Sequence, residues 1–145
     1  MPLLVGCLVL HALIAGIAPS PWWVPDLTVV GLCLAIIGAP RHWLGLSAVA
    51  GLFTMVWAIR FPVPIALGYL ALGASIRFLA GQWDLEDQRA QDAVVAVSSA
   101  FIAAGLIWLD DCWSLRLVGW LVVRITMTIL AALLVRRLPL ARTRA

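Results

Sequence analysis

The sequence predicts an all-α polytopic membrane protein, a single integral membrane domain over residues 1–145 that is built as a six-transmembrane-helix bundle. Three observations predict this class. Hydrophobic residues make up 64% of the chain and charged residues only 12%, well below the quarter that is usual in a soluble domain. The mean hydropathy is +1.07. The apolar residues also fall into long runs that are separated by prolines or charged turns.

Six apolar segments form the expected membrane helices. The first lacks the basic stretch that opens a signal peptide, so we expect it to be a membrane helix. Prolines separate the first four segments from one another, as suits a residue that opens helices and cannot continue their hydrogen bonding. The second segment is short for a membrane helix. The expected segments are 2–18, 26–39, 43–59, 63–79, 88–109 and 113–135.

The last segment is long enough to cross a bilayer, which takes about 20 helical residues. A pair of arginines ends it, and the basic tail 136–145 follows. Because arginines close to a membrane helix are retained in the cytoplasm, we expect the C-terminus to be cytoplasmic. Arg124 lies near the middle of this segment, where a charge costs about 2.5–3.5 kcal/mol on insertion scales. The other helices must accommodate it.

The arginines also predict the orientation of the other helices. Six crossings place the N-terminus in the cytoplasm together with the C-terminus. Seven arginines then lie on the inner side, against only Arg60 and Arg116 on the outer side. The net positive charge of the chain therefore indicates its orientation in a lipid bilayer and not binding to nucleic acid. The inner arginines are Arg41, Arg77, Arg89, Arg136, Arg137, Arg142 and Arg144.

A polar face is expected on the last helix, where Arg116, Trp120, Arg124 and Thr128 are spaced by four. Polar groups inside a membrane segment usually face the bundle interior or a cavity. We therefore expect a polar seam or pocket with Arg124 as its main charge; the alternative is that Arg124 only fixes packing by bonding hydroxyls or carbonyls. No acidic residue lies deep in a segment, so an ionic partner for Arg124 is expected from a ligand or another protein. Further candidates for the seam are His11, Ser98 and Ser99, together with Thr54 and Ser75.

Nothing in the sequence indicates catalysis. It contains no P-loop, HExxH motif or paired intramembrane carboxylates. Its three cysteines are widely spaced and suggest neither a disulfide framework nor a metal site. We expect no enzymatic activity, no catalytic residue, no metal and no cofactor.

The entry to the second helix carries a recognisable motif, Pro25-Asp26-Leu27, after a proline-rich turn. Asp26 is expected to cap this helix at the outer membrane boundary. With the basic turn Pro40-Arg41-His42 and the stop Arg136-Arg137-Leu138, the chain resembles the bacterial rod shape-determining protein MreD family. The resemblance implies a fold akin to the membrane substrate-binding subunits of energy-coupling-factor transporters. It also implies a place in the bacterial inner membrane beside MreC, MreB, RodA and a penicillin-binding transpeptidase.

These observations and the resemblance give two functional hypotheses. The first is a non-catalytic scaffold or regulator of the cell-wall elongation complex, which binds MreC directly and supports peptidoglycan synthesis. The second is a substrate-binding membrane subunit of a transporter, which takes a small anionic ligand near Arg124. A binder should have a closed polar cavity around Arg124, whereas a scaffold should have an exposed apolar groove.

Overall fold

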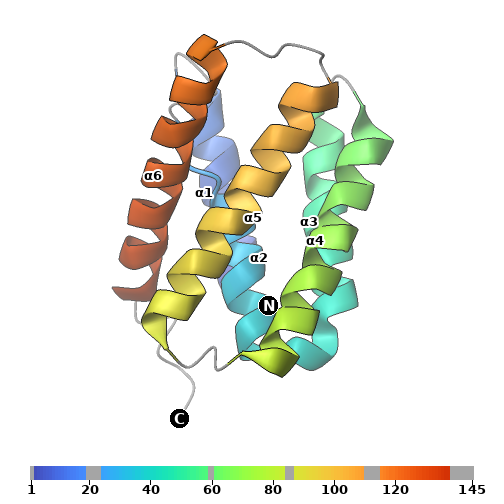
Figure 1. Cartoon of the computed structure of the whole chain (residues 1–145). Coiled ribbons are helices and arrows are strands. Elements are labelled where there is room, and N and C mark those ends of the chain that lie inside the picture. The colour runs from blue at the N-terminus through green and yellow to red at the C-terminus, as the bar shows by residue number, and fades with distance from the viewer. Residues whose placement is uncertain (1, 19–23, 59–60, 84–86, 110–114, 138–145) are drawn as a thin grey trace.

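The computed structural model is all-helical in the residues that it describes, which are 2–18, 24–58, 61–83, 87–109 and 115–137. The predicted all-α class is confirmed. Successive helices run in opposite directions, so that the chain passes back and forth through the bundle (Figure 1). The elements are α1 (Pro2–Ile17), α2 (Leu27–Gly38), the short 3-10 helix η2 (Pro40–His42), α3 (Trp43–Trp57), α4 (Pro62–Gln82), α5 (Gln88–Leu109) and α6 (Leu115–Arg137).

Three helices in the described ranges are long and apolar enough to cross a membrane: α4, α5 and the Leu117–Arg137 part of α6. This agrees with the predicted membrane protein. The helices α1 and α2 are apolar but shorter. With 12 residues, α2 measures about 18 Å at the helical rise of roughly 1.5 Å per residue. It therefore covers only part of the roughly 30 Å of a bilayer core.

The short helix α2 forms the centre of the bundle. Nine of its 12 residues are buried, and it contacts each of the other five helices. Such a helix is apolar on all sides because all sides are covered by protein. In Figure 1 it lies behind α5 and fills only the lower half of the bundle. None of the described helices occupies the bundle axis in the upper half.

Small residues allow close contacts between the helices. A Cβ atom built on Gly31 of α2 would lie 2.7 Å from Cβ of Cys7 in α1. A Cβ atom on Gly51 of α3 would lie 3.1 Å from the backbone oxygen of Ala66 in α4. These glycines allow the backbones to approach, which is how helices associate where lipid removes the hydrophobic driving force.

An ion pair joins α5 and α6 at the lower end of the bundle in Figure 1. Arg136 Nη1 lies 2.7 Å from Asp92 Oδ1 and 3.5 Å from the Gln88 carbonyl oxygen. The exposed arginines Arg41, Arg77, Arg89 and Arg137 belong to helix ends at this same end of the bundle. The other predicted orientation residues, Arg142 and Arg144, lie outside the described residues.

Candidate functional site: a buried ion pair beneath a cavity

Asp26 caps α2, as predicted. Its Oδ1 atom accepts a hydrogen bond of 3.2 Å from the backbone N–H of Val29. The turn before the helix is closed by a 2.9 Å bond from Leu27 N–H to the Pro25 carbonyl. The negative carboxylate also lies at the positive end of the helix dipole. These contacts fix the direction of the carboxylate.

The location of this cap differs from the expected one. Asp26 is only 1% exposed and lies deep inside the bundle, not at its outer boundary. The reason is the length of α2, whose 12 residues are too few to extend from one end of the bundle to the other. The chain therefore enters the bundle through Val24, which is also buried, before α2 begins.

Asp26 is the ionic partner of Arg124. Arg124 Nη2 lies 3.1 Å from Asp26 Oδ2, and the two side chains are 13% and 2% exposed. The prediction that Arg124 has no acidic partner within the chain is wrong. It assumed that a residue at a helix start lies at a membrane surface, whereas the start of α2 lies level with the middle of α6.

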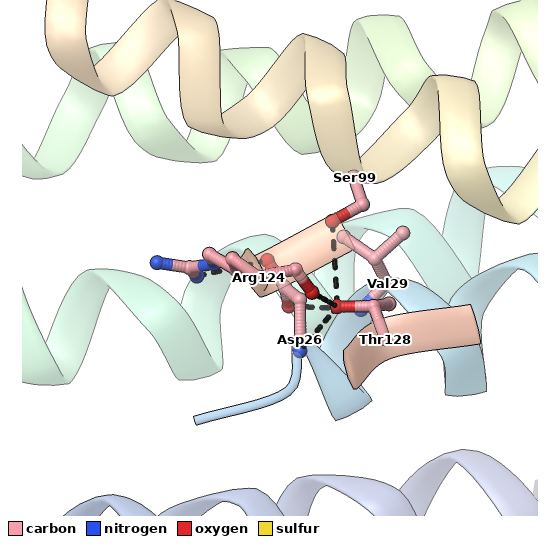
Figure 2. Close-up of polar contacts among 5 residues, drawn as sticks. All are labelled: Asp26, Val29, Ser99, Arg124 and Thr128. Atoms are coloured by element: carbon pink, nitrogen blue, oxygen red, sulfur yellow. Dashed lines mark hydrogen bonds and ion pairs between the residues drawn. The ribbon is translucent and has the colours of Figure 1, made fainter. Parts of the chain in front are cut away.

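Thr128 joins both partners of this pair (Figure 2). The Asp26 backbone N–H donates to Thr128 Oγ1 at 3.0 Å, and the same hydroxyl donates to the Arg124 carbonyl at 2.8 Å. Ser99 of α5 donates to Thr128 Oγ1 at the longer distance of 3.5 Å. Three helices thus meet at one polar centre, the Asp26–Arg124 centre, which we define as Asp26, Ser99, Arg124 and Thr128.

The energetics of the centre favour a paired state. Either charge alone, buried as the two side chains are, would carry an uncompensated desolvation penalty of several kcal/mol. Asp26 receives compensation from the guanidinium, the Val29 N–H group and the helix dipole. Arg124 is less completely satisfied, because its buried Nε atom has no hydrogen-bond partner among the described residues.

A cavity of about 460 Å³ lies above this centre, in the half of the bundle that α2 does not fill. Asp26 and Arg124 form part of its lining, and His11, Thr54 and Tyr69 supply the other polar side chains. The remaining lining is apolar or small and comes mostly from the last turns of α1, α3 and α5. It consists of Ala12, Ala15, Gly16, Phe53, Ala58, Ile65, Ile102 and Leu106.

The structure brings together only some of the predicted seam residues. Arg124, Thr128 and Ser99 belong to the Asp26–Arg124 centre, and His11 lines the cavity. Ser98 is buried beside Cys33 of α2 instead. The Arg116 side chain lies outside the described residues. Within the motif 25–27, Pro25 is half-buried and Leu27 is in the core.

Sequence reasoning missed two participants. The pairing of Asp26 could have been suspected from the shortness of the segment that follows it, since a 12-residue helix cannot start at one surface and end at the other. Tyr69, the one tyrosine of the chain, lies in the middle of an apolar segment. That position alone marks its hydroxyl as a group needing a partner.

The fold and the Asp26–Arg124 centre together define a class of protein. It is an all-helical bundle that has helices able to span a membrane and an ion pair in its interior. No protein-family model matches the chain, and comparisons with curated proteins and with solved structures find no significant match.

Proposed function

We propose that the protein is a non-catalytic scaffold or regulator in the bacterial inner membrane, within the cell-wall elongation complex. In this proposal the chain crosses the membrane six times with both termini in the cytoplasm. Its direct partner is MreC, and RodA, MreB and a penicillin-binding transpeptidase belong to the same assembly. The sequence motif 25–27 and the other MreD-like features motivate the choice of complex. One structural observation supports the scaffold role, namely an apolar groove between α4 and α5.

The α4–α5 groove consists of two hollows of about 230 and 380 Å³ that share Phe101 in their lining. The first reaches from Pro64 towards the middle of α4, and the second continues to Trp83 beyond its end. The groove thus follows α4 for almost its full length of 21 residues, or about 32 Å. This matches the length of a membrane-spanning helix.

The lining of the groove suits a helix from a partner protein. Gly68 and Gly105 allow close backbone approach, while Ser75 offers an exposed hydroxyl to an incoming helix. Phe101 is 55% exposed there, which leaves a large apolar side chain available for contact. We propose that the single membrane helix of MreC occupies this groove.

The Asp26–Arg124 centre supports a structural role for the charged residues. Arg124 is neutralised by Asp26 inside the same chain, and no external anion is needed to balance it. The second candidate, a transporter subunit that takes a small anionic ligand near Arg124, is favoured by the adjacent cavity alone. The ion pair removes the unpaired positive charge on which that candidate rests.

A site-specific photocrosslinker tests the scaffold proposal. Benzoylphenylalanine replaces Phe101 in the α4–α5 groove, or Val122 on α6 as the matched control, since both side chains are more than half exposed at 55% and 58%. Irradiation of native membranes should give a crosslink to MreC from position 101 and not from position 122. Crosslinking to a second copy of this chain, or to lipid only, would contradict the proposed occupant.

A further inference from the structure

We infer that the cavity above the Asp26–Arg124 centre is a binding site for an uncharged small molecule with an apolar body and one amide-like polar head. This site goes beyond the proposed scaffold function and does not depend on it. The cavity volume of about 460 Å³ falls in the range of roughly 300–1,000 Å³ that is usual for small-molecule sites. It also shows the usual composition of such sites, with mostly apolar walls and a few polar groups.

Unpartnered polar groups in the lining point to a ligand. Tyr69 lines the cavity, is only 3% exposed and lies within electrostatic reach of Asp26 and Arg124. His11 Nδ1 is buried and has no hydrogen-bond partner in the described part of the chain. Because an unsatisfied buried polar group costs about 1–3 kcal/mol, such a group beside a cavity favours a molecule that supplies a partner.

Arg124 contributes a second unsatisfied group. Its Nη2 atom bonds Asp26, whereas its buried Nε atom has no hydrogen-bond partner among the described residues. The guanidinium therefore has a spare N–H donor beside the cavity that it lines. A carbonyl oxygen on a ligand suits this donor, and an N–H group suits an acceptor nitrogen of His11. An amide group carries a carbonyl oxygen and an N–H group in one plane.

The opposite charges of Asp26 and Arg124 favour an uncharged ligand in the cavity. Among the described residues of the lining, only Asp26 and Arg124 carry a full charge, and their charges are opposite and paired. An anion entering the cavity would lose its hydration and meet a guanidinium that Asp26 already neutralises. The apolar walls formed by residues such as Phe53, Ile102 and Leu106 favour a ring or a short hydrocarbon body.

Benzamide is the probe for the test because it combines an apolar ring with one amide. Its binding to the purified full-length protein in lipid nanodiscs is measured by saturation-transfer NMR titration. Benzoate has the same ring with an anionic head, and toluene has the ring with no polar head. Benzamide should bind more tightly than either. Tighter binding of benzoate would overturn the inference in favour of an anion site, and equal binding of toluene would overturn it in favour of a purely apolar hollow.

Two variants locate the bound probe. Tyr69→Phe removes a hydroxyl of the cavity lining and should weaken benzamide binding roughly 3- to 10-fold, as expected for one hydrogen bond. Ser75→Ala on the same helix removes a hydroxyl that bonds the Ala71 carbonyl outside the cavity, and it should leave binding unchanged. Equal binding by the two variants and the parent protein would show that the probe lies elsewhere.

A cavity-filling variant keeps the test independent of the polar residues. Gly16 lines the cavity, and a Cβ atom built on it meets no atom within 4 Å. Gly16→Leu should therefore fold normally while its side chain occupies the space and abolishes benzamide binding. Gly6→Leu is the matched control, because Gly6 is equally open on the same helix but lines a different hollow. Retained binding in Gly16→Leu would overturn the assignment.

Discussion

Arg124 Nη2 lies 3.1 Å from Asp26 Oδ2, although the two residues are 98 positions apart in the chain. This contact joins the last helix to the start of the second and sets the depth at which α2 begins. The carboxylate acts both as a helix cap and as a counter-ion, so its two oxygen atoms have different partners. The stability of the bundle should therefore respond to each partner separately.

Arg124→Met should destabilise the protein by about 3 kcal/mol, because it leaves the Asp26 carboxylate buried without its counter-ion. The double variant Asp26→Asn/Arg124→Met should recover most of this loss, since Asn still caps the helix and no charge remains. Thermal unfolding of the purified protein provides the measurement. Arg137→Met, at an exposed arginine of the same helix, is the control and should have little effect. A single variant as stable as the parent would show that the pair is not structural.

Thr128→Val should lower the free energy of unfolding by about 1–3 kcal/mol. The change preserves side-chain shape but removes the acceptor for the buried Asp26 N–H group. The control, Thr126→Val, deletes an exposed hydroxyl that bonds only the carbonyl of its own helix, Val122. Chemical or thermal unfolding of both variants gives the comparison. Equal effects at the two positions would mean that the bond between Asp26 and Thr128 adds nothing to stability.

Gly51→Ala should destabilise the contact between α3 and α4. The added methyl group would meet backbone atoms of Ala66, which cannot rotate away as a side chain can. Gly105→Ala, where the new atom meets open space, should be neutral or slightly stabilising because alanine favours a helix by up to about 1 kcal/mol. The midpoint of thermal unfolding distinguishes the two. Destabilisation of the same size in both would indicate a loss unrelated to helix packing.

Fusions to alkaline phosphatase test the proposed orientation, because this enzyme needs the oxidising exterior to form its disulfides. A fusion after Leu109, at the end of α5, should be active. A fusion after Ala145, behind the arginine-rich tail, should be inactive. The opposite pattern would reverse the orientation of the bundle and place the exposed arginines outside.

The helices could be predicted from the sequence because each one depends on a local pattern of apolar residues and punctuating prolines. Residues 88–109 form a helix as expected, and the other helix boundaries differ by only a few residues. The capping role of Asp26 was equally local. Its pairing with Arg124 was not, because the depth of a helix start depends on how all the helices pack. The cavity could not be predicted for the same reason, because it lies in the part of the bundle that α2 does not reach.

The short helix α2 also affects the order in which the bundle can assemble while the protein is being synthesised. Asp26 leaves the ribosome 98 residues before Arg124, a delay of about 5–20 s at typical translation rates. Until then the buried carboxylate has no counter-ion, and the 12 residues of α2 are too few to hold a transmembrane position alone. We therefore expect the N-terminal half of the bundle to reach its final arrangement only after α6 has been made. Chains that stop before α6 should be recognised as unfinished and degraded by membrane proteases.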